Sequence, residues 1–323
     1  MSVLVFTENW DGKFKRLSFE LVSYASSLAG MLNTSVTAVT IGKAEGDELK
    51  KLGEFGADRI LNITCPQLSF LDNRAYATII SEVARKENSG VILFSNNNTG
   101  KALAPRVAVR LKAGMASGVN GLPSGVEPFV VRKRAFSGNA FAHVVIKTPY
   151  KVITLAQNSF EPASRPTGAV PEEMEVSIDG SSVKARMLET QKQSGRIVLT
   201  DADIVVSGGR GMRSPDNWGP LVELATLLGG ATACSRPVSD EGWRPHEEHT
   251  GQTGKIIAPN LYIAVGISGA TQHLAGVSAS KYIVAINTDK DAPIFETAQY
   301  GIVGDAMKVL PKLVETVRNI RKH

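Results

Sequence analysis

Cysteine is almost absent from this chain, with two among 323 residues. Cys65 and Cys234 are too few for a disulfide framework or a four-cysteine metal site, so a small disulfide-stapled fold is excluded. We expect both to be small buried residues, and we expect no metal site. The sequence also lacks any apolar run near the roughly 18 residues that a membrane-spanning helix needs. No stable insertion into a membrane is therefore expected.

Concentrated charge is missing as well. The 36 Lys and Arg residues exceed the 31 Asp and Glu residues by five, and the longest basic run is Arg132, Lys133 and Arg134. A dedicated nucleic-acid-binding protein normally gathers its basic residues, so we expect no nucleic-acid partner. The first residues, MSVLVFTENW, show neither the basic segment nor the cleavage site of a signal peptide. They predict a strand and a cytoplasmic protein.

The length suits about two domains, and in the first half strand and helix patterns alternate. Strands are predicted at 3–7, 35–41, 58–63 and 91–94, and helices at 17–28, at 45–55 and after the N-cap residue Asp72. Such alternation is typical of a mainly parallel sheet. Further strands at 128–136, 141–148 and 151–157 are expected to extend or cover that sheet.

A change of character follows near the middle of the chain. Residues 158–171 are rich in Pro, Ser and Gly and resemble a connector, and two polar strand candidates follow at 175–180 and 183–191. Residues 195–304 hold 15 of the 30 glycines, and such density suggests main chain wrapped closely around a ligand. We therefore predict domains at 1–194 and 195–323, with a hinge between 190 and 200 near Gly195.

Two glycine motifs in the second domain resemble known nucleotide motifs without matching them. Residues 203–218 predict a strand, a glycine turn and a helix start, but Ser214 stands where the dinucleotide fingerprint needs its third glycine. Residues 249–256 are not a P-loop, because His249 replaces the first glycine and Ile256 follows the lysine. The first turn would still offer N–H groups and Arg210 to an anion or an electron-rich ring, although an ordinary tight turn is the plainer interpretation.

Polar residues also follow two predicted strands near the C-terminus. Gln272 and His273 begin a helix after one strand, and Asn287 ends the next. Polar residues at the carboxyl ends of parallel strands lie where α/β proteins bind ligands, although a lone histidine is more often structural. The acidic residues between 240 and 248 predict a solvated loop rather than an acid–base pair. We therefore expect no catalytic residues.

Four segments together resemble the signature of the electron transfer flavoprotein α subunit. They are VVSGGRGM, CSRPVSDEGW, TGQTGKIIAPNLYIAVGISGATQHLAG and YIVAINTDKDAPIFETAQYGIVGD, in order and correctly spaced over about 200–310. VLVFTENWDGKFK is similar to the family's opening strand and turn, and Thr250 and Pro237 depart from its usual residues. The resemblance implies an N-terminal parallel-sheet α/β domain with extra strands that contacts a β subunit, and a C-terminal doubly wound domain that binds FAD.

The resemblance also implies roles for individual residues. Arg210 would lie against the isoalloxazine ring, and Gln252 and Thr253 would reach that ring. The remaining cofactor-binding residues divide into those near the flavin and its phosphates (Ser235, Arg236), those at the pyrophosphate and the pyrimidine edge (Ser268, Gly269, Ala270, Thr271, Gln272, His273), and those at the adenosine half (Asn287, Asp305). Thr250, through its backbone, and Gly251 would also contact the cofactor.

The implied function is electron transfer. FAD would take electrons singly from acyl-CoA dehydrogenases of fatty-acid β-oxidation or other flavin dehydrogenases, and pass them to a quinone reductase or similar acceptor. The partner would be a β subunit that contributes a facing lobe and usually AMP. Two alternatives stay open: an electron-bifurcating variant with a second FAD in the β subunit, and a nucleotide-binding regulatory protein without a redox role.

Overall fold

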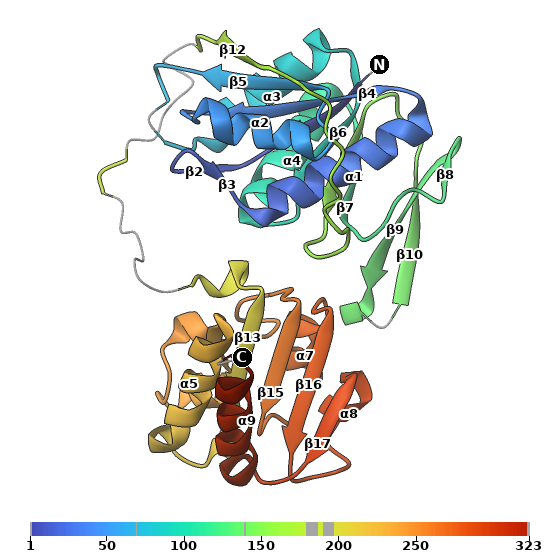
Figure 1. Ribbon diagram of the computed structural model, residues 1–323. Coiled ribbons are helices and arrows are strands. Elements are labelled where there is room, and N and C mark those ends of the chain that lie inside the picture. The colour runs from blue at the N-terminus through green and yellow to red at the C-terminus, as the bar shows by residue number, and fades with distance from the viewer. Residues whose placement is uncertain (1, 69, 139, 179–186, 190–196, 322–323) are drawn as a thin grey trace. The chain divides into compact units, whose positions relative to one another are not determined.

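The computed structural model describes residues 2–68, 70–138, 140–178, 187–189 and 197–321 (Figure 1). The chain forms two compact units. Unit 1 comprises Met1–Ala135 and Asn139–Thr190, and unit 2 comprises Phe136–Gly138 and Gln191–His323. The boundary expected at 194/195 and the hinge residue Gly195 lie outside the described residues. Both stay predictions.

Unit 1 is built on a large sheet whose strands follow the order β10-β9-β7-β11-β6-β1-β4-β5-β12. Its parallel part consists of β1 (Ser2–Phe6), β4 (Ser35–Ile41), β5 (Arg59–Thr64), β6 (Ser89–Ser95), β7 (Gly114–Val119) and β11 (Lys151–Leu155). Helices α1 (Arg16–Leu32) and α2 (Gly46–Glu54) pack on one face, and α3 (Asn73–Lys86) and α4 (Asn98–Leu111) on the other. The predicted parallel sheet is confirmed.

The extra strands extend the sheet in two ways. β9 (Phe129–Ala135), β10 (Ala140–Ile146) and the short β8 (Gly125–Val126) add an antiparallel ribbon at one edge, whereas β11 lies inside the sheet between β6 and β7. The sequence pattern missed α4 and β7. A small hairpin of β2 (Asn9–Trp10) and β3 (Lys13–Phe14) follows β1.

The opposite edge of the sheet is β12 (Pro171–Glu175), which pairs in parallel with β5. The strand predicted at 175–180 is therefore wrong in position, and residues 187–189 of the strand predicted at 183–191 are not a strand. The rest of the latter lies outside the described residues. Val176 and Ile178 do pack on the core, so the apolar alternation reflects burial although strand pairing ends at Glu175.

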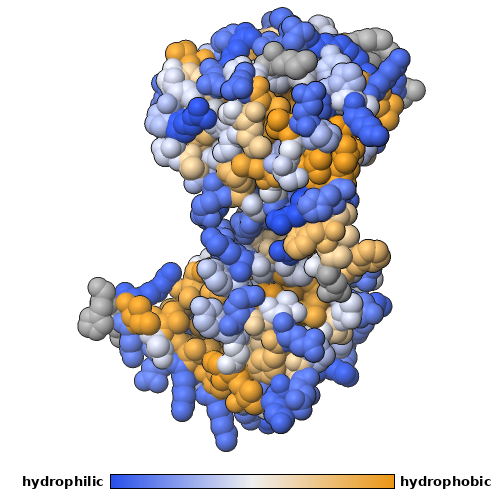
Figure 2. All heavy atoms as spheres, turned by 90° about the vertical axis from the view of Figure 1, so that its right-hand side faces the viewer, coloured by the Kyte–Doolittle hydropathy of each residue, from blue (hydrophilic) through white to orange (hydrophobic). Residues whose placement is uncertain are grey.

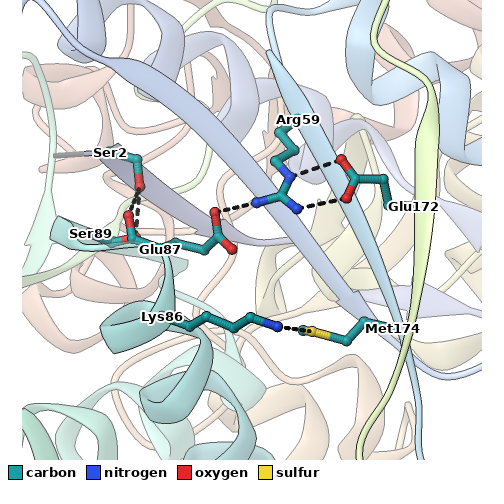
Figure 3. A network of polar contacts seen from close by, with 7 residues as sticks. All are labelled: Ser2, Arg59, Lys86, Glu87, Ser89, Glu172 and Met174. Atoms are coloured by element: carbon teal, nitrogen blue, oxygen red, sulfur yellow. Dashed lines mark hydrogen bonds and ion pairs between the residues drawn. The ribbon is translucent and has the colours of Figure 1, made fainter.

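Charged side chains explain why β12 pairs with β5 at this position. Figure 3 shows Arg59 of β5 between two carboxylates: Nη1 donates to Glu87 at 2.6 Å, and Nε and Nη2 donate to Glu172 at 2.8 and 2.7 Å. Asn62 donates to Glu173 at 2.7 Å. The missing N–H of proline is tolerated at the first residue of an edge strand. The partners on β12 lie over 100 positions from those on β5, so the local pattern does not reveal them.

The connector that leads to β12 is fixed against α1 by a buried carboxylate. Glu20 accepts hydrogen bonds from the backbone N–H groups of Asn158, Ser159 and Phe160 at 3.1, 2.8 and 3.1 Å. Burial raises the pKa of Glu20 to about 7, although the three N–H groups oppose this shift. The carboxylate therefore titrates near neutral pH.

Unit 2 has a five-stranded, wholly parallel sheet. Its strands, in spatial order, are β14 (Ala231–Cys234), β13 (Ile204–Gly208), β15 (Leu261–Val265), β16 (Tyr282–Asn287) and β17 (Tyr300–Val303). Helices α5 (Gly219–Leu228) and α9 (Ala306–Ile320) cover one face, and α7 (Thr271–Val277) and α8 (Ile294–Thr297) the other (Figure 1). The predicted doubly wound domain is confirmed.

The outer strand of this sheet, β17, exposes all four of its residues. Figure 2 looks onto this side of unit 2 and shows hydrophobic residues at its surface. The C-terminal helix α9 begins at Ala306, where Asp305 caps it. Within the described ranges no helix is long and apolar enough to cross a membrane.

Candidate functional site

A cavity of about 720 Å³ lies in unit 2 at the carboxyl ends of the strands. The chain passes from β13 to β14 on one side, and β15 then lies on the other side of β13. Ligands of doubly wound folds bind where the strand order reverses in this way, because the turns on either side diverge and leave a crevice. The turns after β13, β14 and β15 and the last residue of β16 all contribute to the cavity wall.

Twelve of the fifteen residues predicted to bind the cofactor line this cavity. They are Arg210, Ser235, Arg236, Thr250, Gly251, Gln252, Thr253, Ser268, Ala270, Gln272, His273 and Asn287. The other three are Gly269, Thr271 and Asp305. The structure thus brings together residues from four separate segments of the chain.

The three remaining candidates have other surroundings. Gly269 has a φ of +86°, and a Cβ there would lie 2.4 Å from the backbone nitrogen of Ile294. Thr271 is the exposed first residue of α7. Asp305 accepts a hydrogen bond from the N–H of Met307 and pairs with Arg213 at 2.9 Å, beside a smaller cavity of about 130 Å³ that Asn287 also lines.

Two turns meet at the cavity through glycine backbones. Gly209 and Gly211, after β13, donate hydrogen bonds to the carbonyl oxygens of Val265 and Gly266, at 2.9 and 3.0 Å. Gly266 has a φ of +61°, and a Cβ on it would lie 2.7 Å from the Cα of Gly211. A side chain at either position would force these turns apart.

The GQTG turn is held in a similar way. A Cβ on Gly276 of α7 would lie 2.5 Å from the Cα of Gly251, and the N–H of Gln252 donates to the carbonyl of Gln272 at 2.7 Å. The side chains of Gln252 and Thr253 stay exposed. The backbone of this turn is therefore fixed while its polar side chains remain available to a ligand.

Each of the two arginines at the cavity has a carboxylate partner on or beside the short helix α6 (Arg236–Asp240). Arg236 Nε lies 3.3 Å from Asp240 Oδ2, and Arg210 Nη1 lies 4.0 Å from Glu241 Oε1. Pro237 occupies the first turn of α6, where a helix needs no N–H donor from it. The loop geometry is therefore compatible with this departure from the family pattern.

The acidic segment differs from its sequence interpretation. Asp240 and Glu241 are exposed, as expected of solvated residues, but they line the cavity. Glu248 is buried and accepts two hydrogen bonds from Arg244, at 2.6 and 2.8 Å, so a solvated loop is wrong for this residue. The spacing of four between Arg236 and Asp240 was the available signal for their pairing.

Two buried histidines line the cavity, and one of them, His249, was not among the predicted site residues. The Nδ1 atoms of His249 and His273 have no hydrogen-bond partner among the described residues. Burial lowers the pKa of both, to about 4 for His273, where nearby His249 adds to the effect and the backbone of Thr250 opposes it. Both rings are therefore neutral at physiological pH.

Cys65 and Cys234 are both buried free cysteines, as predicted. Burial raises the pKa of the Cys234 thiol to about 12, so it is not a reactive thiolate. Among the described residues no three or more His, Cys, Asp or Glu side chains are grouped to hold a metal ion.

These residues fit FAD. Arginines and free backbone N–H groups favour the anionic pyrophosphate. The glycine contacts hold the turns around the cavity close together, and buried imidazole nitrogens without partners can meet the polar edge of a ring. A cavity of about 720 Å³ lies within the size range of cofactor sites.

Comparison with known proteins agrees with this architecture. The family model of the electron transfer flavoprotein domain matches residues 3–179, and that of the electron transfer flavoprotein FAD-binding domain matches residues 198–278. The electron transfer flavoprotein subunit alpha of Thermoanaerobacterium thermosaccharolyticum is 39% identical, over 99% of this chain and 98% of the relative. That of Bacillus subtilis is 34% identical over 99% and 98%.

A third relative carries a different name. The acryloyl-CoA reductase electron transfer subunit beta of Anaerotignum propionicum is 30% identical, over 98% of this chain and 95% of the relative. The matches extend over both units, and the second family model is that of a FAD-binding domain. The chain therefore belongs to the electron transfer flavoprotein family, as an α subunit with FAD as its cofactor.

Proposed function

We propose that this chain and a β subunit form an electron carrier between flavin dehydrogenases, such as acyl-CoA dehydrogenases, and a quinone reductase or similar acceptor. Membership of the α-subunit family supports electron transfer and a heterodimer. The observation that carries the proposal is the cavity at the carboxyl ends of β13 to β16, lined by residues from all four signature segments. AMP in the β subunit and a cytoplasmic location are further predictions from the sequence.

The proposed roles follow the chemistry of each side chain. Bound FAD would supply the electron-accepting ring, and the chain's own residues would bind and orient it. Arg210 would place positive charge beside the ring, and Gln252 and Thr253, exposed on a fixed turn, would donate hydrogen bonds to it. His273 would face the carbonyl that gains negative charge on reduction.

The other predicted residues would hold the rest of the cofactor. Ser235 precedes and Arg236 begins α6, and residues 268–273 form the turn before α7 and the start of that helix, so their N–H groups would face the pyrophosphate. Gly269 and Thr271 would act through the backbone of that turn. Asn287, whose Nδ2 donates to the carbonyl of Ile267 at 2.9 Å, and Asp305 would contact the adenosine half.

Co-expression with the β subunit tests the proposal. We expect a one-to-one heterodimer that holds one FAD tightly on the α chain, and an α chain that binds FAD weakly when alone. Mass, flavin absorbance and a reductive titration measure these quantities. A colourless heterodimer, or a stable and fully flavinylated α monomer, would contradict this assembly.

An electron-bifurcating variant is the second candidate, favoured by one observation. A relative that covers nearly the whole chain is named an acryloyl-CoA reductase electron transfer subunit. A bifurcating heterodimer would contain two FAD molecules, the second of them in β. The same flavin stoichiometry therefore separates the two candidates. The alternative of a nucleotide-binding protein without a redox role is not retained, because the chain belongs to a family of electron carriers.

A further inference from the structure

Tyr262 of β15 does not line the cavity, but it makes a buried contact with His273, which does. The side chain is fully buried, and its hydroxyl oxygen lies 2.8 Å from Nε2 of His273. The ring centroids are 6.1 Å apart at an interplanar angle of 43°, so the two rings meet through their polar atoms rather than by stacking. Strand β15 thus holds the first turn of α7, the helix that follows the turn predicted to bind the cofactor.

The chemistry of the two groups indicates which one donates. A phenol, with a pKa of about 10, is a good donor, and a neutral imidazole nitrogen, whose conjugate acid has a pKa of about 6.5, is a good acceptor. Burial raises the pKa of Tyr262 and lowers that of His273, so both stay neutral. The favoured arrangement has the Tyr262 hydroxyl donating to Nε2, and a neutral ring then carries its hydrogen on Nδ1.

The Nδ1 atom of His273 is buried and makes no hydrogen bond of normal geometry among the described residues, although the backbone of Thr250 lies near the ring. A buried donor without a partner is unfavourable unless a ligand supplies an acceptor. The same ring lines the cavity, and the first residues of α7 around it are predicted to meet the pyrimidine edge of the flavin. An N–H donor on this ring therefore suits an electron-rich carbonyl.

We propose that Tyr262 is a positioning residue that holds His273 in the tautomer with hydrogen on Nδ1 and so presents one N–H donor to the carbonyl edge of the cofactor. The part of this inference that concerns the cofactor rests on the proposed function. The part that concerns the tautomer does not, since the hydroxyl–imidazole contact lies within the chain itself.

Nitrogen NMR of the full chain tests the tautomer directly. The chain has five histidines; with all of them labelled with ¹⁵N, the signals of His273 are identified by their loss in His273→Asn. We expect Nδ1 of the wild-type protein to have the shift of a protonated nitrogen and Nε2 that of an unprotonated one. Hydrogen on Nε2, or two averaged shifts, in the wild-type protein would overturn the proposal whatever Tyr262→Phe shows.

Tyr262→Phe removes the hydroxyl and keeps the ring. We expect the two nitrogen shifts of His273 to move toward each other as the tautomers mix. Tyr282→Phe is the matched control, because Tyr282 is half-exposed at the start of β16 and does not line the cavity. It should leave both shifts unchanged. Unchanged shifts in folded Tyr262→Phe would also overturn the proposal.

The FAD-loaded heterodimer supplies the second measurement. We expect Tyr262→Phe to retain one FAD and to lower its reduction potential, because an oriented donor is lost, whereas Tyr282→Phe keeps the wild-type potential. If Tyr262→Phe changes the tautomer but leaves the potential unchanged, the assignment of the tautomer stands and only the proposed role toward the cofactor is overturned. A heterodimer without FAD would instead contradict the proposed function, and the NMR result would still decide the tautomer.

Discussion

Arg210, after β13, and Glu241, at the end of α6, face each other at the cavity, with 4.0 Å between Nη1 and Oε1. Both side chains are largely exposed, so the pair contributes at most about 1 kcal/mol and can open without a large cost. Arg210 can therefore exchange this carboxylate for a cofactor that gains negative charge. Glu241 opposes that charge from the same wall of the cavity.

Glu241→Gln should consequently raise the reduction potential of the bound FAD. A contribution of up to about 1 kcal/mol corresponds to a rise of at most about 40 mV in a one-electron potential. Glu247→Gln changes the charge equally but lies outside this cavity, and it should shift the potential less. Potentiometric titration at low and high salt checks both variants, since screening should shrink the shift. A fall in potential, or equal shifts in both variants, would contradict the assignment.

Arg210→Ala should lower the potential of the bound FAD. A hydrogen bond to a charged group contributes about 1.5–3 kcal/mol, which corresponds to about 60–130 mV. Arg210→Lys should restore only part of this shift, because an ammonium group lacks the planar face of guanidinium. Redox titration of the three proteins measures the order. An alanine variant with the wild-type potential would exclude contact between Arg210 and the ring.

Gly266→Ala should destabilise unit 2 by at least about 2 kcal/mol, because a φ of +61° disfavours an L residue and the new Cβ meets the Gly211 backbone. Gly219→Ala is the control. Gly219 begins α5 with open space around its Cα, so alanine there should be neutral or stabilise by up to about 1 kcal/mol. Thermal unfolding with and without FAD compares the two variants. Equal stability of both would contradict the close approach of the turns.

The stability of unit 1 should fall as the pH rises from about 4.5 to about 7, because of Glu20. Its folded pKa of about 7 exceeds the ordinary value of 4.5, so its contribution is fully present below about pH 4.5 and is lost as the pH rises through 7. A shift of this size corresponds to about 3 kcal/mol. Urea unfolding at pH 5 and pH 8 measures the loss.

Glu20→Gln should flatten this pH dependence, because an amide does not titrate. It should also lose part of the hydrogen bonding to residues 158–160, since one carboxylate oxygen is replaced by a donor. Glu161→Gln provides the control, as Glu161 is exposed and paired with Arg16. That variant should keep the wild-type slope. A Glu20→Gln protein with an unchanged slope would assign the pH dependence to another group.

Local patterns predicted the elements that follow simple rules and missed those that depend on distant contacts. The N-cap of α3 was predictable because Asp72 accepts from the N–H groups of Arg74 and Ala75, two and three residues on. Helix α4 was not, because Pro105 interrupts a helical pattern that burial of Leu103 and Val107 nevertheless stabilises. The position and the pairing of β12 could not be predicted either, because they depend on contacts with β5, which is distant in the sequence.

The same distinction applies to the candidate site. Arg210, Gln252 and Asn287 were found because they stand in signature segments, and the parallel sheet brings the ends of those segments to one edge. His249 was missed because it stands just before a signature segment, and Glu241, although within one, was interpreted as a solvated loop residue. Their place at the cavity depends on how the loop after α6 folds back beside the GQTG turn. That loop is held by the local ion pair between Arg244 and Glu248 and by the longer-range hydrogen bond from the N–H of Thr250 to the carbonyl of Cys234.

The paired glycines of unit 2 also limit how this sequence can evolve. Where two side chains touch, enlargement of one can be compensated by truncation of the other. Gly211 faces Gly266, and Gly251 faces Gly276, backbone against backbone, so neither member of a pair has a side chain left to shorten. No second substitution in the partner residue can therefore compensate for a larger side chain at any of these positions. Descendants of this chain should keep all four glycines as long as they keep the cavity.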